Sequence, residues 1–301
     1  MDMSRFRGVM TASVTPVCEN GSLDTAAVAA LMDYYAENGI TGVLWPSSTG
    51  EYFAMTAQQR RECVKTAASH NRGGLTILAN ISEGSLAQAM ENARAMADNG
   101  ADAVVLMPPQ FHHHTQDELV EYYSYAADHS PLPLIIYNHM TRLPSKVDIP
   151  TVMKLKDHPN LIGIKDTHND AARLMTLSTL LGPEDEFVIM AGGDGMAGYS
   201  AIYHMEMLNA LCAIRPDLFV EMYRAGRENN LQKVSQLQQR VNRLMAVFTA
   251  LKGGKSSAAL FSQAVKVALS FKGLCSAKAV QLGYELDEAD IANVAKVLEK
   301  V

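Results

Sequence analysis

Two segments of the chain, residues 38–43 and 99–104, repeat one pattern. Each begins with Asn-Gly, a pair that commonly ends a helix, and runs through a short loop into an apolar stretch. A short apolar run between turn signals is typical of a strand that is buried on both faces. A helix that leads into such a strand, twice in one chain, indicates repeated βα units with parallel strands.

The same alternation extends over most of the chain. Thr56 with Gln59, and Thr115 with Glu118, form capping boxes that predict helix N-termini between strands. Eight strand–helix units favour an α/β fold, a closed (β/α)8 TIM barrel, over an open doubly wound sheet. The apolar runs that predict strands lie at residues 8–15, 42–46, 75–79, 103–107, 134–138, 161–165 and 187–190, with a less regular eighth within 205–213.

The last part of the chain changes to helices only. After residue 228 the apolar periodicity predicts helices at residues 230–250, 257–271 and 287–301. We therefore expect a (β/α)8 catalytic barrel over residues 1–228 and a C-terminal three-helix appendage over residues 229–301 that packs on the barrel.

The composition argues against several kinds of protein. A net charge of -6, a pI near 5.8 and the absence of Lys/Arg runs argue against a nucleic-acid partner. The 4 cysteines lie far apart without CxxC or zinc-ligand spacing, so we expect reduced thiols and no metal. The first residues lack the apolar core of a signal peptide, and no apolar run reaches the roughly 18 residues of a membrane span. We expect a cytoplasmic protein with no membrane partner.

The functional prediction depends on Lys165, which ends the sixth predicted strand. That strand begins with apolar residues and a glycine and then places an ammonium group at its end. A lysine in an apolar wall loses hydration of its charged form, so a neutral amine becomes accessible for attack on a ketone. The alternative is a structural lysine that reaches water or pairs with Asp166.

Other residues at the carboxyl ends of the predicted strands suit the same chemistry, because the active site of a TIM barrel lies at this face. Ser48 and Thr49 follow the second strand, Tyr137 ends the fifth, and a glycine-rich loop over residues 192–195 follows the seventh. A phenol carries protons, while hydroxyls and backbone N–H groups hold a carboxylate. The alternatives are a core tyrosine and turn residues that cap the following segment.

Three motifs at these positions resemble those of the dihydrodipicolinate synthase / N-acetylneuraminate lyase superfamily of class I pyruvate-type aldolases. They are Ser48-Thr49-Gly50-Glu51, Tyr137-Asn138 and Gly163-Ile164-Lys165-Asp166, and they fall at the matching strands in the matching order. The resemblance covers essentially the whole chain. It implies that Lys165 forms the Schiff base and that Tyr137 transfers protons, with Thr49 as the third catalytic residue. It also implies that Ser48, Thr49 and Gly50 form the turn that binds the substrate carboxylate.

The resemblance also implies what the site acts on. Members of the superfamily act on pyruvate or other 2-keto acids, usually as homotetramers (dimers of dimers), with no metal and no organic cofactor. We therefore expect small-molecule partners, a 2-keto acid or pyruvate together with an aldehyde, and a homotetramer.

Two residues bear on the choice of substrate. Phe111 takes the place of a tyrosine that, in many relatives, serves a proton relay across a subunit interface, and a phenyl ring cannot carry a proton. Arg142 occupies the place where the synthase holds the carboxylate of its aldehyde substrate, and its guanidinium suits a distal carboxylate. The alternative for Arg142 is a solvated loop arginine.

The sequence leaves open the roles of residues in the eighth predicted strand and in one run of histidines. Leu208 is expected to contact the substrate, and Glu206 and Asn209 could reshape the substrate cavity. The run His112–His114 is expected to be a solvated loop, although beside the site it could touch a hydroxylated or anionic substrate; three consecutive histidines do not easily converge on one metal ion.

We predict a lyase that forms a Schiff base and cleaves or condenses a 2-keto-3-deoxy acid, with pyruvate as product or donor. The rivals are a 2-keto-3-deoxy sugar acid dehydratase that uses the same imine, and dihydrodipicolinate synthase (4-hydroxy-tetrahydrodipicolinate synthase), which Phe111 disfavours. Outside this class, the chain could be a non-catalytic relative that binds a keto acid, or another phosphate-binding barrel.

Overall fold

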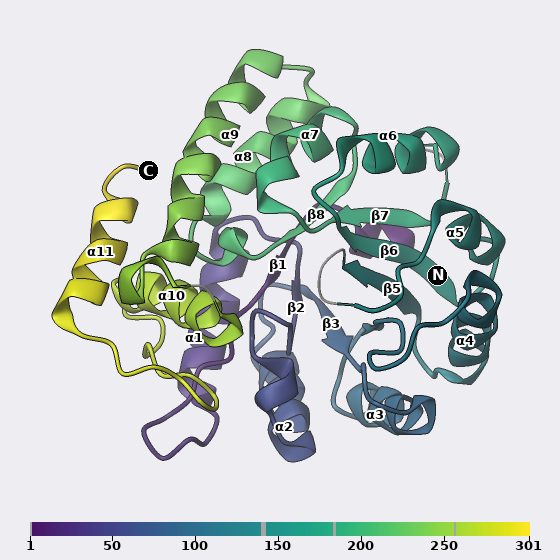
Figure 1. Cartoon of the computed structure of the whole chain (residues 1–301), viewed down its shortest axis with the longest axis horizontal. Helices are drawn as coiled ribbons and strands as arrows, with labels where there is room; N and C mark the ends of the chain where they lie inside the picture. The colour runs from purple at the N-terminus through teal and green to yellow at the C-terminus, as the bar shows by residue number, and fades with distance from the viewer. Residues whose placement is uncertain (1, 140–142, 183–184, 256) are drawn as a thin grey trace.

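Eight parallel strands close into a barrel, and helices connect each strand to the next (Figure 1). The computed structural model describes residues 2–139, 143–182, 185–255 and 257–301. The strands neighbour one another in chain order, and the last pairs with the first. The predicted α/β fold, a (β/α)8 TIM barrel, is confirmed with all eight predicted strands. They are β1 (Val9–Ala12), β2 (Gly42–Leu44), β3 (Thr76–Asn80), β4 (Ala103–Leu106), β5 (Leu134–His139), β6 (Leu161–Thr167), β7 (Val188–Ala191) and β8 (Glu206–Asn209).

A helix follows each strand and covers the outside of the barrel (Figure 1). Both predicted capping boxes are present, at Thr56 and Thr115. The connecting helices are α1 (Thr25–Glu37), α2 (Ala57–Ser69), α3 (Leu86–Asp98), α4 (Gln116–His129), α5 (Ile149–Leu155), α6 (Ala171–Leu180), α7 (Ala197–Ile202) and α8 (Pro216–Arg227). Short 3-10 helices are η1 (Met3–Phe6), η2 (Tyr52–Ala54), η3 (Asp194–Met196) and η4 (Leu211–Ala213).

The core has two layers, one inside the barrel and one between the strands and the helices. Because side chains alternate along a strand, every strand supplies both layers: in β1, Val9 belongs to the outer layer and Met10 to the inner one. Strands buried on both faces read as continuous apolar runs, which is the pattern that predicted them. The inner layer includes Met10, Ala12, Leu44, Leu78, Val105, Ile135, Val188, Met190 and Leu208.

The C-terminal helices lie on one side of the barrel, and the first of them lies next to α8 (Figure 1). They are α9 (Leu231–Leu244), α10 (Ala258–Ser270) and α11 (Glu288–Leu298), with η5 (Met245–Thr249) and η6 (Lys252–Gly254) between the first two. α9 packs against α7 and α8, while α10 packs against η4 and η5. The three predicted helices are confirmed, although the first and the third end earlier than predicted. The boundary between residues 228 and 229 stays a prediction. Every helix of the described residues is too short or too polar to cross a membrane.

One glycine allows two strands beside the site to approach closely. A Cβ added at Gly163 in β6 would lie 2.5 Å from the carbonyl oxygen of Val188 in β7. Such a contact forces backbone to move, so glycine is required for β6 and β7 to lie at their observed spacing. Gly163 lies two residues before Lys165, and any shift of β6 here moves the end of the strand.

We therefore predict that Gly163→Ala destabilises the protein by about 1–3 kcal/mol through overpacking. Urea unfolding measures this change in free energy. Gly84→Ala is the matched control, because a Cβ added at Gly84 meets nothing within 4 Å. Equal unfolding midpoints for the two variants would contradict the close-approach argument.

Candidate active site

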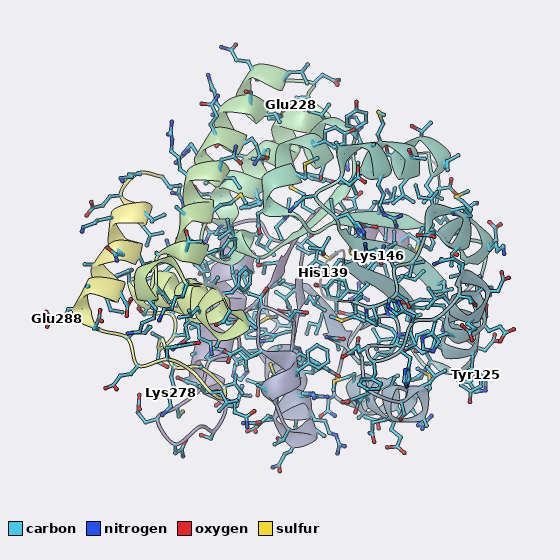
Figure 2. All side chains as sticks on the ribbon, in the orientation of Figure 1. Tyr125, His139, Lys146, Glu228, Lys278 and Glu288 are labelled. Carbon is cyan, nitrogen blue, oxygen red and sulfur yellow. The ribbon has the colours of Figure 1, made fainter. Side chains whose placement is uncertain are left out.

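A cavity of about 280 Å³ opens at the carboxyl ends of the strands. Every strand-end residue proposed from the sequence as catalytic lines this cavity. His139, which also lines it, marks its place near the centre of the barrel in Figure 2. Since TIM-barrel active sites lie at this face, the cavity is the candidate active site. Its lining comprises Ala12, Ser48, Thr49, Tyr137, His139, Lys165, Thr167, Asn169, residues 192–195, Leu208 and Ala210, together with Met245, Phe248 and Phe261 from the C-terminal helical part.

Lys165 and Tyr137 lie side by side in this cavity. They are paired residues of β6 and β5, so their side chains leave the sheet on the same face. The Nζ atom of Lys165 lies 4.1 Å from the centroid of the Tyr137 ring, and only 4% of the lysine is exposed. The lysine is therefore held against the phenol rather than extended into water.

Asp166 does not pair with this lysine, because strand alternation points it to the opposite face. Its carboxylate accepts hydrogen bonds from His168 Nδ1 at 2.7 Å and from Arg173 Nε at 2.9 Å. Burial by itself raises the pKa of Asp166, but the His168 hydrogen bond and the Arg173 charge outweigh burial and hold the pKa below its usual value. Arg173 and Asn138 also donate to the carbonyl oxygen of Val147. This network fixes the ends of β5 and β6, and so the positions of Tyr137 and Lys165.

The turn after β2 presents Ser48 and Thr49 to the cavity. The Ser48 hydroxyl is buried and has no hydrogen-bond partner among the described residues, whereas Thr49 is 5% exposed. The N–H of Gly50 donates to Ser47 Oγ at 2.9 Å, and Ser47 Oγ donates to the carbonyl of Ser13 at 2.8 Å. Gly50 thus holds the turn in shape and lies outside the cavity lining, while the Ser48 hydroxyl is available to a ligand.

The structure brings some of the other predicted residues to the site and leaves others away from it. Leu208 lines the cavity. Phe111 does not, and 87% of it is exposed in a single chain. Arg142 lies outside the described residues. Glu206 begins β8 at the other end of the barrel, where it accepts hydrogen bonds from the Gly8 N–H and the Tyr223 hydroxyl, so it does not shape this cavity.

Asn209 and the histidine run are also absent from the cavity lining. Asn209 is buried, and neither of its side-chain polar atoms has a partner among the described residues. Residues 112–114 lie in a loop, mostly exposed to solvent. Across the described residues, no group of three His, Cys, Asp or Glu side chains is arranged to hold a metal ion.

Some residues that line the cavity were not predicted from the sequence. The strand prediction ended β6 at Lys165, but the strand continues to Thr167. Alternate residues of a strand share a face, so a longer predicted strand would have placed Thr167 in the cavity wall. Phe248 and Phe261 come from the C-terminal helices, and no local pattern indicates that these helices reach the mouth of the barrel.

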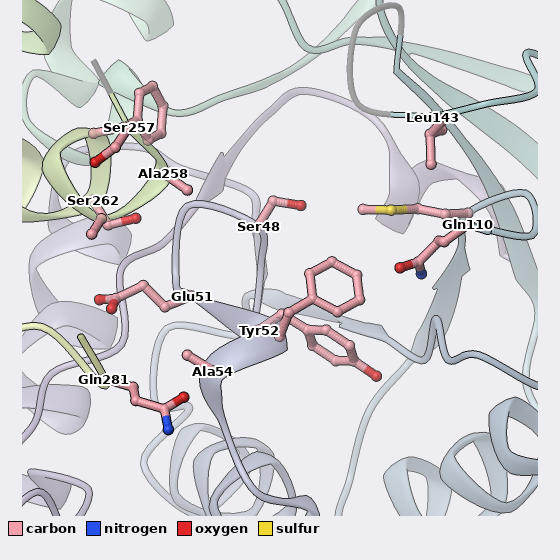
Figure 3. Close-up of a pocket in the computed structure, with 14 residues that line it drawn as sticks. Ser48, Glu51, Tyr52, Ala54, Gln110, Leu143, Ser257, Ala258, Ser262 and Gln281 are labelled. Carbon is pink, nitrogen blue, oxygen red and sulfur yellow. The ribbon is translucent and has the colours of Figure 1, made fainter. Parts of the chain in front are cut away.

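A second, larger cavity of about 720 Å³ adjoins the first, and the two share Ser48 and Phe261 as lining residues. In Figure 3, Ser48 points into the space between η2 and Leu143. The lining is mainly apolar and comprises Ser48, Glu51, Tyr52, Phe53, Ala54, Met107, Gln110, Leu143, Ser257, Ala258, Ala259, Phe261, Ser262 and Gln281.

The fold and the site define a barrel enzyme with a buried lysine and a phenol at its strand ends. The chain belongs to the dihydrodipicolinate synthetase family, which its sequence matches over residues 5–299. Members of this family are lyases of the class I aldolase type. The family resemblance drawn from the three motifs is therefore confirmed.

Individual relatives cover almost the whole chain. It is 30% identical over 276 residues to the 4-hydroxy-tetrahydrodipicolinate synthase of Phenylobacterium zucineum (strain HLK1), covering 90% of this chain and 89% of that one. It is 27% identical over 299 residues to the N-acetylneuraminate lyase of Rhizobium meliloti (strain 1021), covering 99% and 96%. The dihydrodipicolinate synthase structure from Bacteroides thetaiotaomicron superposes with a TM-score of 0.91 at 25% identity, over 98% of each chain.

Asp194, in the loop after β7, is a buried carboxyl group in the wall of the cavity. It accepts a hydrogen bond from the N–H of Leu211 at 3.0 Å. Burial raises its pKa to about 7, although the Leu211 hydrogen bond and the positive charge of Lys165 oppose the rise. Since the native protein keeps a proton here that the unfolded chain has released, native stability falls as the pH rises from about 4 to about 7.

Asp194→Asn removes this titration and keeps an oxygen that can accept from Leu211. We predict that the stability of this variant, relative to the wild type, rises by about 3 kcal/mol between pH 4.5 and pH 8. Urea unfolding at the two pH values measures the difference. A difference that stays constant with pH would contradict the raised pKa.

Proposed function

We propose that this chain is a Schiff-base lyase that cleaves a 2-keto-3-deoxy acid into pyruvate and an aldehyde, and joins them in the reverse direction. The observation that carries the proposal is the contact of the Lys165 Nζ with the Tyr137 ring, inside one cavity with Ser48 and Thr49. A nucleophilic amine, a proton carrier and a carboxylate-binding turn are the groups that this reaction requires.

In the cleavage direction, the neutral amine of Lys165 attacks the C2 keto carbon of the substrate. Tyr137 donates the proton with which the C2 oxygen leaves as water, so a protonated imine and a Tyr137 phenolate result. The phenolate then takes the proton of the C4 hydroxyl. The electrons of the O–H bond form the aldehyde carbonyl, those of the C3–C4 bond move into the imine, and an enamine results. Protonation at C3 and hydrolysis release pyruvate and free Lys165. Ser48 and Thr49 hold the C1 carboxylate throughout.

Other polar residues of the cavity support a hydroxylated substrate. Thr167, Asn169 and Asp194 line it together with Lys165. The Thr167 hydroxyl is buried without a partner among the described residues, and a buried polar group without a hydrogen bond costs free energy. A hydroxyl group of the substrate could form a hydrogen bond with the Thr167 hydroxyl. This favours a sugar-derived acid as the substrate over the adduct of pyruvate with a simple aldehyde.

The second candidate is 4-hydroxy-tetrahydrodipicolinate synthase, because the relative at 30% identity bears that name. That reaction condenses pyruvate with an amino-aldehyde acid, and it begins with the same imine. Phe111 replaces the tyrosine expected for the proton relay, and this replacement places the synthase second.

We also propose that the chain assembles as a homotetramer. Phe111 and Phe53 are 87% and 53% exposed. Phe53, Met107 and Gln110 line the larger cavity, and the last two lie just before Phe111 in the chain. A two-fold axis beside this loop would let each copy place its Phe111 in the larger cavity of the other, burying both apolar surfaces and forming one dimer of the proposed dimer of dimers.

The first test of the mechanism is covalent trapping. Borohydride reduction in the presence of pyruvate is expected to leave a pyruvate-derived adduct on Lys165 in the wild type, and mass spectrometry locates it. Tyr137→Phe is expected to keep part of the adduct yet lower turnover by about 10²–10⁴-fold, because it removes proton transfer alone. Lys165→Arg is the control without a reactive amine. A wild type with no adduct on Lys165 rules out the mechanism.

Product analysis tests the substrate class. Incubation with sialic acid, ketodeoxy-hexonates and ketodeoxy-pentonates is expected to give pyruvate and an aldehyde from at least one of them. A semialdehyde or another dehydrated keto acid would instead identify a dehydratase. Condensation of pyruvate with aspartate semialdehyde, without cleavage of any deoxy acid, would identify the synthase.

A further inference from the structure

A buried ion pair joins the carboxylate-binding turn to the C-terminal helices. Lys266 of α10 donates to Glu51 Oε1 at 2.7 Å, and the two side chains are 0% and 7% exposed. Lys266 also donates to the carbonyl of Lys278 at 2.7 Å, while Glu51 Oε2 accepts from the N–H of Val280 at 2.9 Å. Lys278 lies in the loop between α10 and α11 (Figure 2). Both charged groups are therefore hydrogen-bonded on more than one side.

Glu51 belongs to the same turn as the residues assigned to the substrate carboxylate. In Figure 3, Ser48 and Glu51 leave this turn in opposite directions, Ser48 into the larger cavity and Glu51 toward α10. The backbone of Glu51 has φ +60°, in the left-handed region that non-glycine residues rarely adopt. The N–H of Glu51 donates to the carbonyl of Ser48 at 3.2 Å. The ion pair thus holds a strained residue that closes the turn.

The same helix also lines the catalytic cavity. Phe261 of α10 lines that cavity, and Ser262, four residues before Lys266, lines the larger one. Residues four apart lie on one face of a helix. The pair between Glu51 and Lys266 therefore fixes the separation between the turn and the helical wall, and with it the space open to the substrate.

Stability alone does not account for a buried ion pair in this place. Taking two charges out of water is costly, and an apolar pair of the same volume often stabilises a fold as well or better. Burial lowers the pKa of Lys266, and the charge of Glu51 opposes this shift. What an ion pair adds over an apolar contact is directed bonding, which sets the distance and orientation of the two elements.

We propose that Glu51 and Lys266 are positioning residues, whose ion pair sets the Ser48–Thr49 turn for the carboxylate of the keto acid. The inference rests on the proposed function. Neither residue touches the reacting atoms; both act through the turn. Loss of the pair weakens keto-acid binding and leaves the reactivity of Lys165 in place.

The test is borohydride trapping of Lys165 across a range of pyruvate concentrations. Lys266→Met is expected to raise the pyruvate concentration for half-maximal adduct by about tenfold or more, with a similar adduct yield at saturation. Glu51→Gln should raise this pyruvate concentration similarly. The double variant should need no more pyruvate than the poorer of the two single variants, because each single substitution already breaks the same ion pair. Lys266→Arg, which keeps the charge, should recover part of the affinity.

Leu237→Ala is the matched control for general loss of stability, because Leu237 is buried in α9 and lines neither cavity. It is expected to lower the melting temperature without changing half-saturation by pyruvate. The inference is overturned if Lys266→Met and Glu51→Gln stay within about twofold of the wild type, or if their effects add in the double variant. The inference is also overturned if Leu237→Ala raises the pyruvate concentration for half-saturation as much as Lys266→Met and Glu51→Gln do. A wild type that forms no adduct overturns the proposed function and this inference together, so the two failures are distinguishable.

Discussion

The site depends on the register of β5 against β6. Leu134 pairs with Leu161, and if that register continued, Tyr137 would pair with Ile164; instead the pairing shifts after Leu134, and Tyr137 pairs with Lys165. A slip of one residue moves a side chain to the opposite face of a sheet. Ile164 belongs to the outer layer of the core, whereas Lys165 lines the cavity. The irregularity at the start of β5 is therefore what places amine and phenol together.

The C-terminal helices complete the site as well as covering the barrel. Phe248 and Phe261 close the cavity beside the strand ends, and α10 reaches the turn after β2 through Lys266 and Glu51. Loops at the mouth of a TIM barrel determine what the barrel acts on, and here a helical segment lies at the same face. In the proposed mechanism, the polar groups of the strand ends carry the chemistry, while the helices limit the shape of the substrate.

The sequence predicted the fold and the strand-end residues that line the cavity, because both follow from local patterns. Apolar runs between turn signals located all eight strands, and Lys165, Tyr137 and Ser48 were found because each lies at or just after a predicted strand end. What it could not predict depends on contacts between distant segments. The exposure of Phe111 in a single chain, the approach of α10 to the turn after β2, and the place of Glu206 at the far end of the barrel all follow from tertiary packing.

In the proposed mechanism, one cavity brings the amine of Lys165, the phenol of Tyr137 and the hydroxyls of Ser48 and Thr49 to a single keto acid. A crystal structure of the protein soaked with pyruvate would reveal this arrangement. We expect continuous electron density from Lys165 Nζ to C2 of pyruvate, with the carboxylate within hydrogen-bonding distance of Ser48 and Thr49. Pyruvate bound elsewhere, or bound in the cavity with its carboxylate turned away from Ser48 and Thr49 and Lys165 unmodified, would contradict it.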